Sequence, residues 1–470
     1  MGQRHDTGTE LAWAALGGDP DLTRRISYGG PPGLLPARLP VLALARSTVA
    51  VCALAAAELA ARRTGRPVPA VRVDDGAVAT AFVSERHMRI DGRAPSTFAP
   101  LSRFWRTADG WLRTHANYPH HRARLLTALG LPATAGVAEV AAELAGRRAE
   151  EVQETVYAAG GLAVAARTPE EWAAHPQGAA VAAHPLLTLE PLGTGAPPRP
   201  LPALAGGPVL PAAGLRVLDL TRVIAGPVAT RTLALLGADV LRIDAPQLPE
   251  SQDAHSDTGF GKRSTVLDLG ARAGRATFEE LLTGADAVVT GYRPGALDRF
   301  GLTPEALAAR RPGLVVARLS AWGDDGPWGG RRGFDSLVQV ATGIAAVEAD
   351  EDGTPGALPA QALDHGTGYL LAAAVLRALT EQARTGGSSL ATLALARTAR
   401  WLVHGPAGDG RADGPADPAA ARYDAARYLR DTDSPVGRLR HALPPVSFDG
   451  GPATWATPPG RWGTDPAAWR

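Results

Sequence analysis

The stretch from Asp364 to Gly368 combines a carboxylate with two glycines at the predicted start of a long helix rich in alanine and leucine. Each glycine in a first turn costs about 1 kcal/mol relative to alanine, so Gly366 and Gly368 point to a close approach of another group to the backbone. Asp364 can be a simple N-cap for this helix. It can also be a nucleophile that carries a covalent intermediate. The local sequence allows both interpretations.

A helix start would suit the chemistry of a nucleophile. The positive end of the helix dipole favours a carboxylate ion, so we expect Asp364 to be ionised. Attack on a carbonyl creates an oxyanion, and the backbone N–H groups near Gly366 and Gly368 could stabilise it. A second predicted helix start is a candidate anion site, because glycine lets a ligand approach and proline suits the first turn. This second site is Ala225-Gly226-Pro227, for which an ordinary helix entry is the alternative.

Three histidines and one cysteine could also do chemistry. A metal site at His115, His120 and His121 is conceivable, but adjacent histidines rarely ligate one ion together and no carboxylate cluster accompanies them. We therefore predict no metal site. Cys52 is the sole cysteine, which excludes an intrachain disulfide. Its apolar surroundings predict a buried, inert thiol.

Composition limits the class of protein. The chain has 470 residues, of which 45% are hydrophobic and 20% charged, as expected for a soluble globular protein of two or three domains. A net charge of +1 gives no support for a nucleic-acid partner. The N-terminus lacks an apolar signal core, and the apolar run around Cys52 is too short to span a bilayer. We expect a cytoplasmic protein without a membrane partner.

The pattern of glycine, proline and apolar residues divides the chain into five parts. Residues 1–38 form a loose lead-in, 39–186 a first half, 187–213 a Pro/Gly-rich linker, 214–404 a second half and 405–470 an irregular tail. In the second half, strand and helix patterns alternate, which predicts an α/β fold with a parallel, Rossmann-like sheet and crossover helices. The predicted strands are 216–221, 239–244, 264–269, 287–290 and 314–319.

A weak internal repeat relates the two halves. Residues 39–48 align with 358–367, and both copies lead into an alanine-rich helix that ends in Arg-Thr-Gly. The first copy has Ala45 where the second has Asp364. Only one copy can therefore do carboxylate chemistry, and we expect one active site per chain.

Several motifs in the second half resemble those of class III CoA-transferases, the carnitine- and formyl-CoA-transferase (CaiB/BaiF) family. They occur in the family's order and end at Asp364, in the position of the family's nucleophilic aspartate. The resemblance implies CoA contacts from Lys262, Arg263, Arg299 and Arg332 as well as from the helix start at Ala225. The matching segments are 214–227, 236–244, 261–269, 291–302 and 332–335.

The first half is similar to the small domain of the same family, through residues 105–111 and 158–172. In ordinary members that part follows the sheet, whereas here it precedes it, so this chain is identified as a rearranged or partly duplicated member. The resemblance implies the class III CoA-transferase fold, with a Rossmann-like half and a smaller α+β domain. Subunits of the family are interlocked, which leaves a homodimer and an intrachain pseudo-dimer both open.

The resemblance implies transfer of CoA from an acyl-CoA to a carboxylic acid acceptor, through an anhydride and a thioester on Asp364. Coenzyme A is then substrate and product, and no permanently bound cofactor is implied. At two places the sequence departs from residues that are common in the family, and these places bear on the choice of substrate. Ile224 replaces a glutamine typical of formyl- and oxalyl-type enzymes, and Thr290-Gly291 replaces a frequent Glu-Asn pair. Formyl and oxalyl substrates are therefore less expected.

Three other functions compete with this prediction. An acyl-CoA racemase or isomerase of the same fold needs a histidine where this chain has Phe334. A nicotinamide dehydrogenase needs a glycine-rich fingerprint after the first strand, and this fingerprint is missing. A non-catalytic CoA-binding homologue is compatible with the rearrangement, although the presence of Asp364 argues against it.

Overall fold

The structure is a computed structural model that describes residues 6–96, 98–193, 195–204, 206–405 and 423–470. A seven-stranded sheet forms its centre, in the order β10-β9-β8-β11-β12-β13-β7. All neighbours pair in parallel except β7 with β13. The six parallel strands follow the Rossmann order, in which the first and fourth strands lie side by side. They are β8 (Arg216–Leu220), β9 (Asp239–Asp244), β10 (Arg263–Val266), β11 (Ala287–Thr290), β12 (Val315–Ser320) and β13 (Ser388–Ala394).

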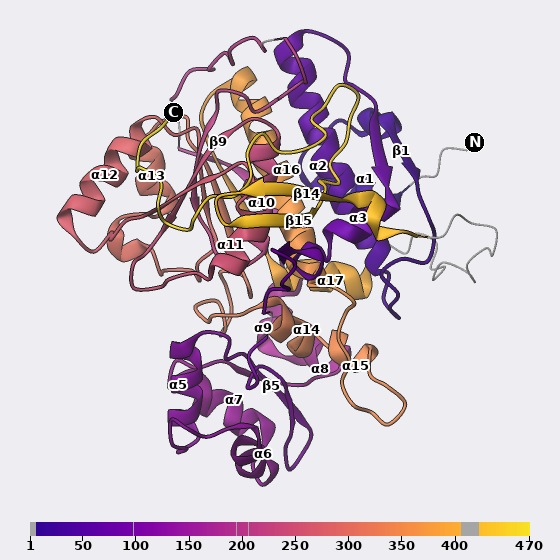
Figure 1. The fold of residues 1–470 in the computed structure, drawn as a ribbon, viewed down its shortest axis with the longest axis vertical. Helices are drawn as coiled ribbons and strands as arrows, with labels where there is room; N and C mark the ends of the chain where they lie inside the picture. Colours follow the sequence, from indigo (N-terminus) through magenta and orange to yellow (C-terminus); the bar gives the residue numbers. More distant parts are fainter. Residues whose placement is uncertain (1–5, 97, 194, 205, 406–422) are drawn as a thin grey trace.

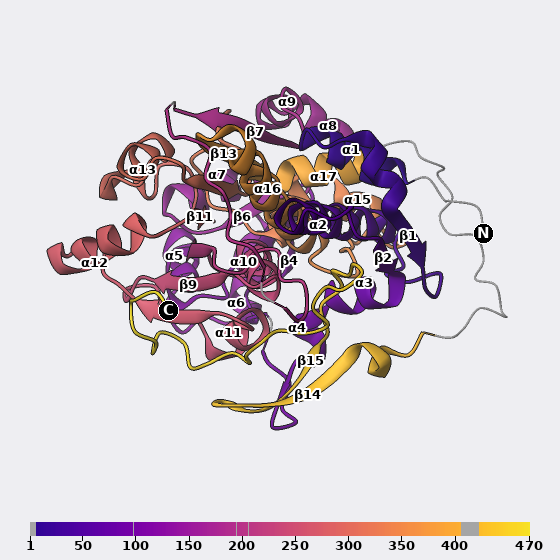
Figure 2. The same cartoon turned by 90° about the horizontal axis from the view of Figure 1, so that it is seen from above.

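Helices cover both faces of the sheet, as a parallel sheet requires. Successive residues of a strand point to opposite faces, so Val217 packs in one apolar cluster and Leu218 in another. The first cluster includes α10 (Ala225–Leu235) and α16 (Ala362–Thr385), and the second includes α12 (Arg272–Thr283) and α13 (Pro304–Arg310). Figures 1 and 2 show α12 and α13 on the side of the sheet away from α16. The predicted α/β class with crossover helices is confirmed.

The N-terminal region repeats the order helix–strand–helix–strand–helix of α13, β12, α16, β13 and α17 (Leu395–His404) in the second half, where two short helices, α14 (Asp335–Ala341) and α15 (Ile344–Val347), are inserted between β12 and α16. The repeated unit has its own parallel strand pair, as β12 and β13 do. The predicted loose lead-in 1–38 therefore contains regular structure. The elements of the N-terminal unit are α1 (Thr7–Ala15), β1 (Ile26–Gly29), α2 (Val41–Thr64), β2 (Val71–Asp74) and α3 (Asp75–Ala81).

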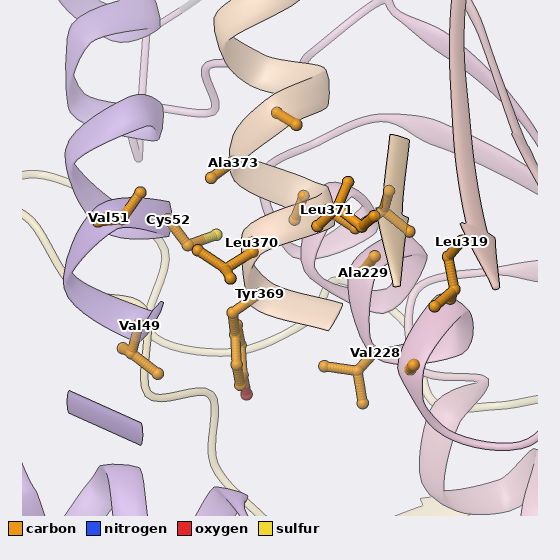
Figure 3. Close-up of a cluster of buried hydrophobic side chains, with 14 of the residues drawn as sticks. Val49, Val51, Cys52, Val228, Ala229, Leu319, Tyr369, Leu370, Leu371 and Ala373 are labelled. Atoms are coloured by element: carbon orange, nitrogen blue, oxygen red, sulfur yellow. The ribbon is translucent and has the colours of Figure 1, made fainter. Parts of the chain in front are cut away.

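Helix α2 packs along α16 in the centre of the molecule. Figure 3 shows Val49, Val51 and Cys52 of α2 beside Tyr369 and Leu370 of α16. Cys52 is fully buried, and burial raises the pKa of its thiol. Helix α2 is long and apolar enough to cross a membrane by length and composition, but 83% of its most apolar window is buried inside this fold.

The small domain follows α4 (Ser84–His87) and β3 (Arg89–Ile90) and has a separate apolar core. It lies at the bottom of Figure 1. The chain then returns through α8 (Pro169–Ala174) and α9 (Pro176–Ala182) to β7 (Leu187–Leu192), so the first residues of the predicted linker belong to the sheet. The elements of the small domain are β4 (Phe104–Arg106), β5 (Trp111–Thr114), α5 (Pro119–Ala128), α6 (Val137–Ala145), α7 (Ala149–Ala158) and β6 (Ala163–Ala165).

The C-terminal tail follows the surface of the sheet. After the hairpin of β14 (Leu429–Ser434) and β15 (Gly437–Ala442), three indole N–H groups fix it to the core. Trp455 donates to the carbonyl of Arg231, Trp462 to Asp244 and Trp469 to the carbonyl of Leu281, each at 2.9 Å. Residues 406–422 of the predicted tail lie outside the described part of the chain.

Candidate active site

A cleft of about 960 Å³ opens at the carboxyl ends of the parallel strands. It lies between the loops that follow β8 and β11, where the strand order changes direction and where open α/β sheets bind their ligands. Sites for small molecules typically enclose about 300–1,000 Å³. The start of α5 in the small domain forms part of the wall, so both halves of the chain build the cleft.

Asp364 lies in this cleft, and its position is fixed by α14 (Asp335–Ala341). The backbone N–H of Asp364 donates to Oδ2 of Asp335 at 2.9 Å, which satisfies a donor that the first turn of α16 leaves free. The other oxygen of Asp335 accepts from Gln339. Asp364 itself is only 6% exposed. A nearly buried carboxyl group therefore lines the cleft.

The protonation of Asp364 differs from the expectation. Helix α16 begins at Ala362 after Gln361, so Asp364 is the third residue of the helix and not its N-cap. Burial raises the pKa of Asp364 well above its ordinary value, and the charges of Asp335 and Glu85 raise it further. The structure opposes the expected ionisation by the helix start, because burial favours the neutral carboxyl group and Asp364 keeps its proton to a higher pH than an exposed aspartate does.

The two glycines after Asp364 face neighbouring helices. A Cβ on Gly368 would lie 2.5 Å from the carbonyl oxygen of Ala225 in α10, and one on Gly366 would lie 3.4 Å from Leu44 in α2. Both glycines are inside α16, and neither lines the cleft. The close approach that the sequence predicted is thus between helices, and the predicted oxyanion role of their N–H groups receives no support from this geometry.

The helix start at Ala225 does border the cleft, next to a strained residue. Val223 has a φ of +70°, which is unfavourable for a β-branched side chain. Both Val223 and Ala225 line the cleft, whereas Gly226 and Pro227 do not. A Cβ on Gly226 would lie 2.4 Å from Cβ of Thr221, so this glycine is needed for packing.

Lys262 and Arg263, which were predicted to contact CoA, lie outside the cleft. The ammonium group of Lys262 is enclosed by Asp219 at 3.1 Å and the carbonyl of Pro227 at 2.9 Å, and burial lowers its pKa to about 8. Arg263 pairs with Asp239 and donates to the carbonyl of Ala468. The sole lysine thus holds α10 against the sheet, and Arg263 holds the C-terminal tail.

Arg299 and Arg332, the other two predicted CoA contacts, line the cleft. Burial lowers the pKa of Arg332, and the positive charges of Arg293 and Arg124 lower it further. Across the described ranges, no carboxylate forms an ion pair with Arg275, Arg293, Arg299 or Arg332. Positive side chains that gather in a cleft without forming ion pairs favour an anionic ligand.

The three histidines adjoin the cleft as aromatic groups. In the described part of the chain, no three His, Cys, Asp or Glu side chains are placed to hold a metal ion. His120 and His121 line the cleft, and His115 stacks on Phe334 with ring centroids 3.7 Å apart. His365 is fully buried outside the cleft, where its Nε2 lies 3.4 Å from Glu85.

Sequence reasoning gave no role to several residues of the site. Arg275 and Arg293 line the cleft without having been predicted to do so, although Arg293 follows directly after a predicted strand and could have been found from that position. Asp335 lies within a matched motif, but its contact with Asp364 required the structure. No feature of the sequence indicates the backbone strain at Val223.

Several curated proteins are similar to part of this chain. A probable fatty acyl-CoA transferase of Mycobacterium tuberculosis, Rv3272, is 34% identical over 201 residues, which cover 40% of this chain and 51% of the relative. A formyl-CoA:oxalate CoA-transferase of Streptomyces avermitilis is 34% identical over 215 residues, covering 41% and 52%. An acetyl-coenzyme A transferase of Hypoxylon pulicicidum, nodX, is 33% identical over 254 residues, covering 52% and 40%. This chain thus spans about half the length of the curated relatives it matches.

Two solved structures are similar over part of the chain. The crystal structure of Rv3272 covers 42% of this chain and 57% of its own, with a TM-score of 0.40. A CaiB/BaiF family protein from Brucella suis is 27% identical, covers 48% and 65%, and has a TM-score of 0.39. The sequence profile of CoA-transferase family III matches residues 3–194 and 212–428. These two segments make up most of the sequence, and the chain therefore belongs to CoA-transferase family III.

Proposed function

We propose that this protein transfers CoA from an acyl-CoA thioester to a carboxylic acid, and that Asp364 carries the covalent intermediates. One observation carries the proposal: within the described residues, the nearly buried carboxyl group of Asp364 lies in the same cleft as four arginines that form no ion pair with a carboxylate. A carboxylate is a nucleophile that can be regenerated, and arginine binds phosphates and carboxylates. The CoA-transferase names of the relatives support the same reaction class.

The reaction begins with attack of an Asp364 oxygen on the thioester carbonyl. A C–O bond forms, the C–S bond breaks, and the products are a mixed anhydride and CoA thiolate. The thiolate then attacks the aspartyl carbonyl of the anhydride and releases the first acid as a carboxylate. The resulting aspartyl-CoA thioester reacts with the acceptor carboxylate in the reverse sequence, which regenerates Asp364 and yields the new acyl-CoA.

The proton on Asp364 sets a condition for this sequence. Since burial and the charges of Asp335 and Glu85 raise its pKa, Asp364 loses a proton before it attacks. The ion that forms is poorly solvated, and a poorly solvated carboxylate is more reactive than one in water. Binding of the thioester and loss of the proton are thus linked steps.

Arginines of the cleft are the proposed contacts for the phosphates of CoA. Arg275 follows β10, while Arg293 and Arg299 follow β11, so all three lie at the nucleotide-binding edge of the Rossmann-like sheet. Arg332 precedes α14 and reaches the cleft from the side of Asp364. An acyl-CoA can therefore extend along the cleft from the sheet edge to the carboxyl group.

The racemase alternative receives less support from this site. Two-base chemistry needs a second base beside Asp364, and Phe334 occupies the expected position. Burial lowers the pKa of His121, the buried histidine of the cleft wall, to about 2, which makes it a weak base. The imidazole of His365 is enclosed outside the cleft.

The test of this proposal is to trap the covalent intermediate on Asp364. The protein is incubated with an acyl-CoA, quenched with hydroxylamine and digested, and a hydroxamate on the Asp364 peptide is expected by mass spectrometry. Asp364→Asn should lose the adduct and at least about 10³-fold of the exchange of labelled acid into acyl-CoA. Asp21→Asn, at an exposed aspartate, is the matched control. Transfer that survives in Asp364→Asn without an adduct would refute the proposal.

A further inference from the structure

Four rings form one wall of the cleft. They belong to Tyr118, His120 and His121 at the start of α5 and to Phe334 just before α14. The ring centroids of His121 and Phe334 are 5.9 Å apart, and those of Tyr118 and His121 are 5.5 Å apart. These separations are typical of interacting aromatic pairs. The four residues are called the ring wall below.

The ring wall and the carboxyl group of Asp364 line the same cleft. Phe334 is bonded in sequence to Asp335, whose carboxylate accepts the N–H of Asp364 at 2.9 Å. His115 stacks on Phe334 from outside the cleft, with 3° between the ring planes, and holds it in one orientation. A thioester on Asp364 would therefore form in a cleft whose wall includes a ring held in place by stacking.

The surroundings of His120 and His121 disfavour the charged form of both imidazoles. Burial is the main cause that lowers the pKa of both His120 and His121, and neighbouring positive groups lower it further. Arg124 acts on both histidines, and Arg222 lies over Tyr118 at 5.0 Å and pairs with Glu250. The four residues thus offer aromatic surface to the cleft, and Arg124 and Arg332 line the cleft near them.

We propose that the acyl group transferred by this protein is aromatic, an aroyl or arylalkanoyl group that packs against the ring wall beside Asp364. This inference rests on the CoA-transferase function proposed above. Aliphatic acyl groups gain only from burial of their surface, whereas an aromatic ring adds edge and face contacts worth about two- to tenfold per pair in an equilibrium constant. Several such contacts in one transition state give a preference that kinetics can measure.

The experiment compares two acyl groups whose rings have the same size, one aromatic and one saturated. Labelled benzoate is exchanged into benzoyl-CoA, and labelled cyclohexanecarboxylate into cyclohexanecarbonyl-CoA, so that no other acceptor is needed. We expect kcat/KM for the aromatic pair to be about tenfold higher or more. Phe334→Leu should reduce this preference to about threefold or less, mainly by slowing the aromatic pair. Phe300→Leu, at a cleft residue outside the ring wall whose ring lies against Arg299, should change both exchanges alike.

The possible outcomes separate this inference from the function on which it rests. Equal exchange of both pairs, or an equal loss for both in Phe334→Leu, would overturn the aromatic preference while leaving CoA transfer in place. Absence of exchange with every acyl-CoA, and of an adduct on Asp364, would overturn the proposed function. Should Phe334→Leu fail to fold, as judged by its thermal melt, His121→Leu makes the same comparison.

Discussion

The buried carboxyl groups of Asp364 and Asp335 are the chemical centre of this molecule at the scale of single residues. Both have raised pKa values, with burial as the first cause. A folded-state pKa above the unfolded value means that the folded protein binds the proton more tightly, so its stability falls as the pH rises through the folded pKa. Asp364, which is proposed to react as an ion, is thus costly to ionise in the free protein.

The cost of ionising Asp364 predicts that replacing Asp364 by a residue that cannot ionise stabilises the fold. Asp364→Asn keeps the shape of the side chain and carries no ionisable group, so the destabilisation above the folded pKa disappears. We expect the melting temperature to rise by about 2–6 °C at pH 8 and to change little at a pH below the ordinary pKa of aspartate. Differential scanning calorimetry at the two pH values measures this. Equal shifts at both would mean that ionisation is not the cause.

The pH dependence of activity tests the coupling between the two carboxyl groups. Activity should rise with pH as Asp364 loses its proton, and the charge of Asp335 is one reason why this occurs above the ordinary range. Asp335→Asn removes that charge and keeps an oxygen for the N–H of Asp364. We therefore expect the acid limb of kcat/KM to move to lower pH. If the acid limb of kcat/KM does not move in Asp335→Asn, this coupling is excluded. The coupling is also excluded if the limb moves as far in Asp268→Asn, which changes another carboxylate of the cleft.

At the scale of elements, α16 carries Asp364, the proposed nucleophile, and two other helices hold α16 in place. Helix α10 crosses it at Gly368, and α2 runs beside it at Gly366. Arg377 of α16 also binds Glu58 of α2 at 2.6 Å in a nearly buried ion pair. Breaking one partner of such a pair typically costs about 3–5 kcal/mol. The N-terminal repeat thus supports the helix on which the reaction takes place.

The two glycines of α16 should respond in opposite ways to alanine. In Gly368→Ala the new Cβ would meet Ala225 O at 2.5 Å and Cβ of Val228 at 3.0 Å, so we expect a loss of about 1–3 kcal/mol. In Gly366→Ala the nearest atom, Cδ2 of Leu44, lies at 3.4 Å, and the gain in helix propensity is about 0.5–1 kcal/mol. Urea unfolding of both variants measures the difference. Equal effects would refute this packing account.

The sequence predicted correctly those elements whose residue pattern can be recognised within a single segment. Apolar runs such as 239–244 and 287–290 are strands at the same positions in the structure. The prediction failed for β7, because Pro191 and Gly193 read as a linker and only pairing with β13 makes it a strand. At the site, a motif identified Asp364, but its protonation depends on Asp335 and Glu85, which the fold brings in from other segments. Periodicity within one segment contains no information on such contacts.

At the scale of the whole molecule, the linker joins two parts that already share one core. Strand β7 from the first part extends the sheet of the second, and α2 from the first packs on α16 from the second. Arg63 of α2 donates to the carbonyl of Pro202 at 2.7 Å and to that of Pro211 at 2.9 Å, so both ends of the linker are anchored. The covalent connection between these anchors contributes little to the fold.

Cutting this connection should therefore leave the molecule assembled. Gly206 and Gly207 are exposed, and neither has a neighbour within 4 Å of an added Cβ, so a protease site inserted between them should be tolerated. After cleavage we expect the two fragments to elute together in gel filtration and to retain most of the exchange activity. Because cleavage makes folding bimolecular, the melting temperature should depend on protein concentration. Fragments that separate without denaturant would show that β7 and α2 bind the second half too weakly to form one core.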